Sequence, residues 1–198
     1  MPGWTARGRT RRTKSERPDR KERSGEQEQS RDPVAHAKEI CLRLLTARPR
    51  TRAELNQALT KRGIAEDVAD RVLGRLSEVG LIDDAAFAEQ WVRSRHTYQG
   101  MGRKALVAEL RRRGVADSTA ARAAAAVDSD AEELRARQLV RAKLRVVSSN
   151  IDETTRVRRL VAMLARKGYS SGLSYRVVRD ELRAAGTETD LLDGPLGE

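Results

Sequence analysis

Apolar residues recur along the middle of the chain in a pattern that appears three times. Each copy holds two leucines four residues apart, then a basic residue, a glycine and an apolar residue. Aligned on Gly63, Gly114 and Gly168, the leucines stand four and eight residues earlier in every copy: Leu55 and Leu59, Leu106 and Leu110, and Leu160 and Leu164. Leucines at i and i+4 mark the buried stripe of a helix. A glycine after a basic residue is typical of a helix end, because glycine adopts the left-handed conformation at least cost.

The same pattern predicts two further helices in each copy. The first helices are expected over Val34–Leu45, Asp84–Thr97 and Asp130–Leu144. The third helices are expected to begin near Glu66, Asp117 and Ser170, where acidic or hydroxyl side chains can cap a helix. A unit of about 50 residues buries little surface alone. We therefore expect an all-α, elongated tandem array of three three-helix repeats that support one another.

The array divides the chain into five expected parts. The repeats are expected over 34–82, 83–128 and 129–186, between a disordered basic tail over 1–33 and a disordered C-terminal tail over 187–198. The first 33 residues carry ten basic and six acidic residues and almost nothing apolar beyond Trp4. Such a composition cannot bury enough surface to offset chain entropy. Runs of β-branched and aromatic residues are nearly absent, which excludes a broad sheet.

Charge indicates the class of partner. The 198 residues include 40 basic and 29 acidic side chains, a formal net charge of +11. The N-terminal tail holds +4 of this charge, which leaves +7 on the remainder. A basic protein attracts nucleic acid or an anionic surface. The alternative is that these side chains only solvate the helices.

The candidate binding residues are the basic side chains on or beside the three middle helices. They are Arg52, Arg62, Arg103, Lys104, Arg111, Arg112, Arg113, Arg158, Arg159, Arg166 and Lys167. Positive charge on the same element of each repeat predicts a basic track along the array. Such a track would contact phosphates, or an acidic protein surface, without reading base sequence.

Catalytic and metal chemistry have little support in the sequence. Cys41 is the only cysteine, which excludes an intrachain disulfide and a cysteine zinc site. His36 and His96 stand in separate repeats without matching ligands. A phosphate loop, an apolar run of the ~20 residues that span a membrane, and a nucleophile with a partner are all missing. We expect a cytoplasmic protein that is no enzyme and uses no cofactor or metal.

Two short segments have alternative interpretations. Gly100–Lys104 places glycines before a basic helix start, as a phosphate-binding turn does. A flexible hinge between two helices is the interpretation we favour. Asp83 and Asp84 could form an acidic metal pair, but a helix cap is favoured.

Several separated motifs together resemble the RecX family. They are the segment 81–95, LIDDAAFAEQWVRSR; the basic middle helix from Arg103 to Gly114 and Val115; and the segment 158–170, RRLVAMLARKGYS. The motifs occur in the family's order, and the resemblance covers about residues 34–186. The second repeat is its most specific part. The long basic tail exceeds the family pattern.

The resemblance implies a regulator of the bacterial recombinase RecA, with a role in DNA repair, homologous recombination and the SOS response. Proteins of this family are elongated tri-helical repeats, similar to winged helices without wings. They bind RecA filaments on single-stranded DNA, inhibit strand exchange and ATP hydrolysis, and have no catalytic residues. The partners implied are the RecA filament and DNA, single-stranded or duplex, without sequence specificity. A monomer is the simplest expectation.

Two other functions compete with this one. Residues 50–82 resemble a helix-turn-helix of a DNA-binding transcription regulator, but the two strands of a wing do not follow. An RNA-binding or ribosome-associated protein fits the charge. Its stacking aromatics are scarce, because the chain has only six aromatic residues.

Overall fold

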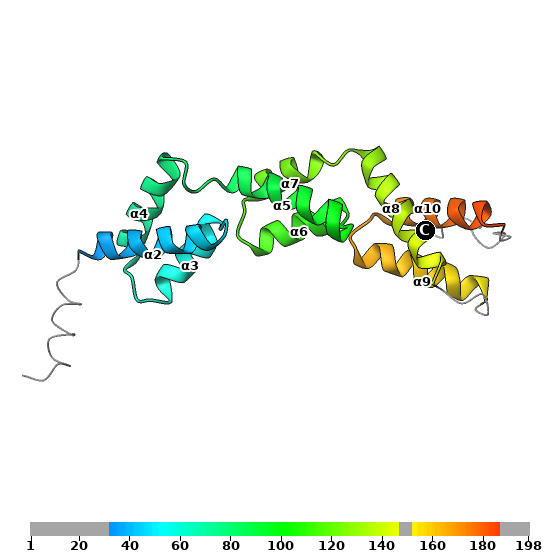
Figure 1. Cartoon of the computed structure of the whole chain (residues 1–198), viewed down its shortest axis with the longest axis horizontal. Coiled ribbons are helices and arrows are strands. Elements are labelled where there is room, and N and C mark those ends of the chain that lie inside the picture. Colours follow the sequence, from blue (N-terminus) through cyan, green and yellow to red (C-terminus); the bar gives the residue numbers. More distant parts are fainter. Residues whose placement is uncertain (1–31, 147–151, 187–198) are drawn as a thin grey trace, which may run out of the picture.

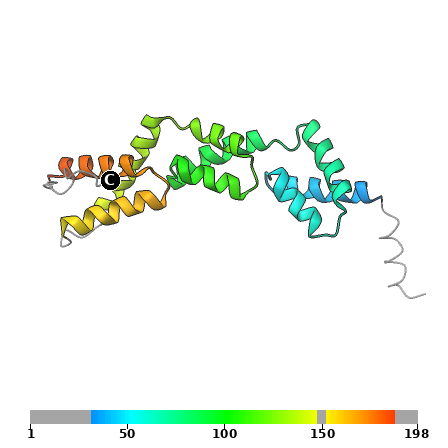
Figure 2. The ribbon, with the colours of Figure 1, turned by 180° about the vertical axis from the view of Figure 1, so that it is seen from behind.

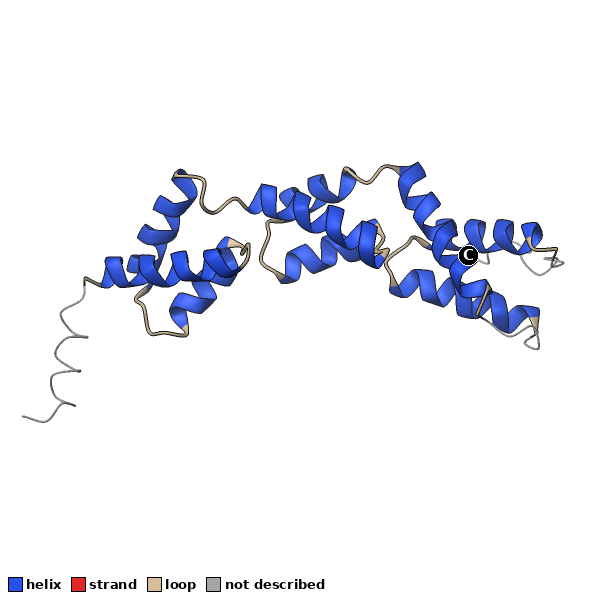
Figure 3. Cartoon of the chain, viewed as in Figure 1, coloured by secondary structure: helices blue, strands red, loops and turns tan. Residues whose placement is uncertain are grey.

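The computed structural model describes residues 32–146 and 152–186, and these residues form nine helices and no strand (Figures 1 and 3). In chain order they are α2 (Pro33–Ala47), α3 (Arg52–Thr60), α4 (Glu66–Glu78), α5 (Asp84–Gln99), α6 (Arg103–Arg112), α7 (Asp117–Ala125), α8 (Ser129–Leu144), α9 (Glu153–Arg166) and α10 (Ser171–Ala184). Nearly all of the expected N-terminal tail and the whole expected C-terminal tail lie outside the described residues.

The helices form three groups of three that follow one another along the long axis of the molecule (Figures 1 and 2). Each group has its own hydrophobic core. The six leucines of the repeated pattern are the centre of these cores and are almost completely buried. The prediction of an all-helical, elongated array of three-helix repeats is therefore confirmed. We propose 34–82, 83–128 and 129–186 as the repeat boundaries, because the buried residues of each core come from one of these ranges.

The middle helix ends in the same way in every repeat. Gly63, Gly114 and Gly168 have φ angles of +73°, +79° and +85°, in the left-handed region. The next residue donates its backbone N–H to the carbonyl of the second leucine, at 3.2, 3.1 and 3.1 Å: Ile64 to Leu59, Val115 to Leu110, and Tyr169 to Leu164. This closure satisfies carbonyls that a helix end leaves free.

The helix starts follow the expected chemistry. The Asp83 carboxylate accepts from the N–H groups of Ala85 and Ala86, both at 2.9 Å, so the interpretation as a cap is confirmed. The third helices begin at Glu66, Asp117 and Ser171, within one residue of the positions expected. Two of the first helices, α2 and α5, end two residues later than predicted, and α8 begins one residue earlier than predicted.

Neighbouring repeats are joined at the start of a middle helix. The helix cap Thr51 donates from Oγ1 to the carbonyl of Arg113 at 2.7 Å. The cap of the next middle helix, Gly102, donates its N–H to the carbonyl of Lys167 at 2.8 Å. Thr51 and Gly102 both stand twelve residues before the glycine of their own repeat, so the two junctions use equivalent positions.

The residue after each cap makes a second equivalent bond. The N–H of Arg52 donates to Asp84 Oδ1 at 2.9 Å, and the N–H of Arg103 donates to Glu132 Oε1 at 2.8 Å. The starts of α3 and α6 thus each give a backbone donor to the repeat that follows. Carboxylates are favoured at these places by the helix dipole.

Close packing completes both junctions. A Cβ atom on Gly114 would lie 2.2 Å from Ala53 Cβ, and one on Gly168 would lie 2.3 Å from Ala105 Cβ. Real Cβ atoms do not approach so closely, so any other residue would move the repeats apart. Glycine is required here by the contact as well as by the positive φ.

The segment Gly100–Lys104 differs from the flexible hinge that the sequence favoured. Gly100 closes α5 with a φ of +62°, and its carbonyl accepts from the buried Tyr169 hydroxyl at 3.1 Å. The N–H of Gly102 is bonded to Lys167 and is unavailable to a phosphate. The hinge interpretation was wrong, because the third repeat packs against this turn and fixes it.

The junctions predict a difference between two equivalent glycine substitutions. Gly114→Ala places a methyl group against Ala53, whereas Gly63→Ala meets no described atom within 4 Å. In both variants alanine must adopt a positive φ, which lowers the free energy of unfolding by about 1 kcal/mol. Overpacking should lower the free energy of unfolding of Gly114→Ala by a further 1–3 kcal/mol, roughly. Urea unfolding of both variants tests this, and equal losses would contradict the account of the junction.

Candidate polyanion-binding surface

A shallow groove runs between α6 and α7 in the second repeat. It has a volume of about 440 Å³ and brings three of the predicted basic residues together. Its lining, here called the α6 groove, consists of Arg103, Lys104, Val107, Arg111, Ala121, Ala124 and Ala125. The alanines of α7 are too short to cover the long side chains of α6. The Ala-rich sequence of α7 therefore leaves the basic face of α6 accessible.

The positive charge at this groove is weakly held by the protein itself. Lys104 and the neighbouring Arg112 are exposed, and no acidic side chain of the described chain pairs with them. Arg111 pairs with Asp117 at 2.7 Å, but the two side chains are 53% and 75% exposed. Such a surface pair contributes about 0–1 kcal/mol. A phosphate or carboxylate from a partner can therefore compete for Arg111.

Two predicted residues are engaged elsewhere, Arg113 at the junction of the first two repeats and Arg52 within the first repeat. The Arg113 guanidinium carbon lies 3.7 Å from the centroid of the Trp91 ring, and the same group forms an ion pair with Glu54 of α3. Arg52 pairs with Asp70 of α4 at 3.1 Å. The charge of Arg113 is thus used within the protein, whereas the pair of Arg52 with Asp70 is exposed at the surface.

Two more belong to the second junction. Arg103 Nε donates to Glu132 Oε2 at 2.6 Å, and the Glu132 side chain is only 7% exposed. Lys167 Nζ donates to the carbonyl of Gln99 at 2.7 Å. Arg103 is thus shared between the α6 groove and the junction.

The other predicted residues are exposed but separate. Arg62 donates to the Ala58 carbonyl of its own helix at 2.8 Å. Arg158, Arg159 and Arg166 extend from α9, and the described chain provides no ion pair to them. The structure brings Arg103, Lys104 and Arg111 together and leaves these four in the outer repeats.

The sequence did not indicate that Arg113 contacts an aromatic side chain of α5. Trp91 stacks on Phe87 at 5.6 Å between ring centroids, and the Arg95 guanidinium lies 4.1 Å from the Trp91 centroid. The i, i+4 spacing of these three residues places them on one face of α5. It could not indicate Arg113, which reaches the same ring from the end of α6.

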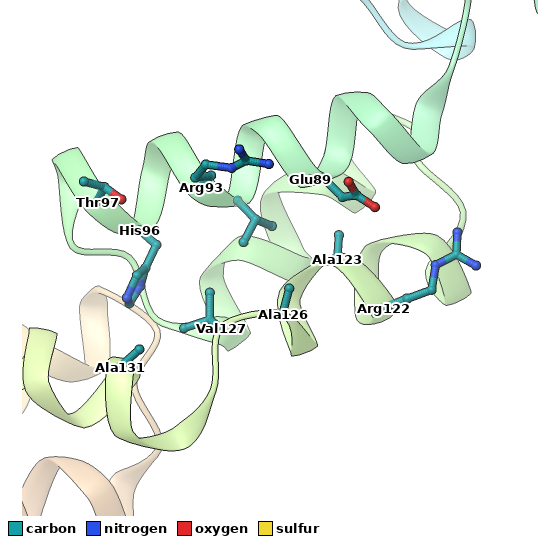
Figure 4. A pocket seen from close by; sticks show the side chains of 10 residues that line it. Glu89, Arg93, His96, Thr97, Arg122, Ala123, Ala126, Val127 and Ala131 are labelled. Atoms are coloured by element: carbon teal, nitrogen blue, oxygen red, sulfur yellow. The ribbon is translucent and has the colours of Figure 1, made fainter. Parts of the chain in front are cut away.

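A second cleft, of about 450 Å³, lies between α5, α7 and the start of α8 (Figure 4). Val92, Ala123 and Val127 form apolar parts of its wall, and Arg93 and Arg122 stand at its edge. His96 also lines it, with Nδ1 2.9 Å from the Met101 carbonyl. Because a carbonyl only accepts, His96 donates this bond. No group of ligands for a metal ion occurs among the described residues.

Much of the basic charge in the third repeat is internally neutralised. Arg137 and Arg141 of α8 donate to Glu181 of α10, at 3.2 Å between Arg137 Nη1 and Oε1 and 2.6 Å between Arg141 Nε and Oε2. Arg137 also bonds Glu133, at 2.7 Å. Burial raises the pKa of the Glu181 carboxyl, but the bonds from Arg141 and Arg137 outweigh it, so that its pKa is lowered. Bonds from Arg137 and Arg176 lower the pKa of Glu133.

This network predicts acid sensitivity in the third repeat. Because the folded-state pKa of Glu181 is lowered, its stabilisation is complete above the unfolded-state pKa, about 4.3. It is lost as the pH falls below that value. Glu181→Gln should reduce the free energy of unfolding at pH 7 by about 1–3 kcal/mol and should make it less dependent on pH between 7 and 3. Chemical unfolding at both pH values tests this, and an equal pH dependence in the two proteins would contradict it.

Family models place two of the repeats among known domains. The model for the first three-helix domain of RecX matches residues 37–76, and the model for the second matches residues 83–123. The helices α2 to α4 and α5 to α7 correspond to these two domains.

Curated relatives and solved structures extend the similarity. Regulatory protein RecX of Amycolatopsis mediterranei is 54% identical over 157 residues, which cover 79% of this chain and 89% of the relative. Regulatory protein RecX of Mycolicibacterium smegmatis is 55% identical over 163 residues, 78% of this chain and 86% of the relative. The crystal structure of RecX from Lactobacillus salivarius superposes with a TM-score of 0.70 at 23% identity, covering 76% of this chain and 97% of that one, and shows the same fold.

Proposed function

The chain belongs to the RecX family, and on that premise we propose that it is a regulatory protein that binds RecA filaments on single-stranded DNA. We propose further that it inhibits their ATP hydrolysis and strand exchange, and that it does so as a cytoplasmic monomer. The described residues contain no helix long and apolar enough to cross a membrane. The observation that supports binding most directly is the α6 groove, where exposed basic side chains have weak partners or none.

The groove suits a polyanion whose sequence is not read. Lys104 and Arg111 of the groove, and Arg112 beside it, present long cationic side chains without a rigid frame of hydrogen-bond acceptors around them. Contacts of this kind are made with phosphates and release counterions. The proposed partners are therefore the nucleoprotein filament and DNA, single-stranded or duplex, without sequence preference. The outer arginines Arg158 and Arg159 extend the proposed basic track to α9.

A helix-turn-helix transcription regulator is not favoured. After α4 the chain continues through the Asp83 cap into α5, and no strand of a wing occurs in the described residues. The start of α3 is also engaged with the second repeat through Thr51 and Arg52.

ATP hydrolysis by RecA tests the proposal. The full-length protein, added at sub-stoichiometric amounts to RecA, single-stranded DNA and ATP, should lower the hydrolysis rate, because it binds the active filament. An unchanged rate with folded protein would overturn the proposed inhibition.

Charge reversal tests the α6 groove. Lys104→Glu with Arg112→Glu should weaken binding to the RecA filament and to DNA by tenfold or more, roughly, and should reduce the salt dependence of DNA binding. Arg113 is kept, because its loss would also break the junction with Glu54. The matched control reverses Arg71 and Arg75, two exposed arginines of α4. Equal weakening by both pairs would show that only net charge matters.

A further inference from the structure

The end of α3 carries an unoccupied copy of the junction surface. In the second and third repeats, the residues before and at the terminal glycine contact the preceding repeat, through the carbonyls of Arg113 and Lys167 and the bare faces of Gly114 and Gly168. The equivalent loop after α3 faces away from the array at its N-terminal end (Figure 1). No described atom lies within 4 Å of the place a Cβ would take on Gly63.

The chemistry of this surface is the same as that of the occupied ones. Gly63 has the same left-handed conformation, with a φ of +73°, and Ile64 closes the helix end in the same way. Arg62 stands where Arg113 and Lys167 stand, and its backbone carbonyl has no donor among the described residues. Within the described ranges, its exposed guanidinium bonds only the Ala58 carbonyl. We call Lys61, Arg62 and Gly63 the α3 end surface.

The occupied junctions define what such a surface binds. At the first one, the occupant is the N-terminus of a helix with three features. Its cap Thr51 donates to the carbonyl before the glycine, the small residue Ala53 lies against the glycine, and Glu54 pairs with the basic side chain. The second junction repeats the donor and the small residue with Gly102 and Ala105. The fitting ligand is thus a helix N-terminus with a cap donor, a small residue and a carboxylate in its first turn.

The middle helices of a second copy of this chain offer no free start with these three features. The starts of α3 and α6 are already occupied at the junctions. The third middle helix begins one turn earlier, because its cap Asp152 stands sixteen residues before Gly168. At the position equivalent to Gly102, the N–H of Arg156 is used inside α9 by the Asp152 carbonyl at 3.0 Å. The longer start of α9 therefore does not present the donor that α3 and α6 use at the junctions.

The preceding segment of the chain has the wrong charge for this surface. Residues 1–31 contain ten basic and five acidic side chains, and Lys61 and Arg62 are also basic. A helix start that carries a carboxylate is attracted by both the charge and the carbonyl geometry. The surface therefore fits an acidic helix start from another protein.

We propose that the α3 end surface binds the N-terminus of a helix of the filament protein, in the manner in which the second and third repeats of this chain bind the repeat before them. This inference rests on the proposed function, since the filament is the partner considered. It assigns the first repeat a docking role that is separate from the α6 groove. The contact is made by backbone groups and by Arg62. It would therefore fix how the protein is oriented on the filament.

Gly63→Asn tests this inference, because asparagine tolerates a positive φ and its side chain would occupy the space that the incoming helix needs. The matched control is Gly80→Asn, at a second exposed glycine with a φ of +73° and no described atom within 4 Å. The probe is the RecA filament on single-stranded DNA, held by an ATP analogue that is not hydrolysed. We expect Gly63→Asn to weaken binding about tenfold, and Gly80→Asn to leave it unchanged. Both variants should unfold at nearly the same temperature as the wild type.

The other outcomes separate the two proposals. If Gly63→Asn binds the filament as tightly as the wild type does, the proposed role of the α3 end surface is overturned and the proposed function stands. Absence of binding by the wild type would overturn the proposed function itself. Equal weakening by Gly63→Asn and Gly80→Asn would contradict a specific contact. Gly63→Asp provides a second variant with the same backbone tolerance, and its carboxylate should weaken binding at least as much.

Discussion

The close contact between a terminal glycine and the start of the preceding middle helix is the constraint on which the molecule depends. A helix start leaves backbone N–H groups without partners, and here the caps and first residues of α3 and α6 give donors to the following repeat. The glycines allow this approach, because a Cβ at Gly114 or Gly168 would lie within 2.3 Å of an alanine. A glycine–alanine contact of this kind occurs at both junctions and joins each pair of neighbouring repeats.

This constraint divides the basic residues into two groups. Arg113 and Lys167, at the ends of two middle helices, serve the junctions. Arg113 contacts Trp91 and Glu54, and Lys167 donates to a carbonyl at the end of α5. Lys104 and Arg112 lie away from these contacts and remain exposed. The net charge of +11 thus overstates the charge available to a partner. The short alanines of α7 keep part of the remaining charge accessible in the α6 groove.

Local patterns in the sequence predicted the helices, the leucine cores and the glycine helix ends, because each depends on residues within one or two turns. The junctions could not be predicted in this way. Thr51 and Arg113 are 62 residues apart, and the place of Arg113 before Gly114 indicates a helix end without indicating its partner. The segment Gly100–Lys104 was misjudged for the same reason, since the third repeat supplies the contacts that fix it. The residues of the α6 groove followed from the helical pattern, but their accessibility depends on α7.

Distance measurement between the outer repeats tests most directly whether the junctions fix the array. Spin labels at cysteines replacing Gln57 of α3 and Ala184 of α10 report on repeats one and three, and both positions are exposed. The native Cys41 is buried, and burial raises the pKa of its thiol, which protects it from labelling. We predict one narrow distance distribution, which broadens when Gly114→Leu separates the first two repeats. A broad distribution in the labelled protein before that substitution would contradict the central role of the junctions.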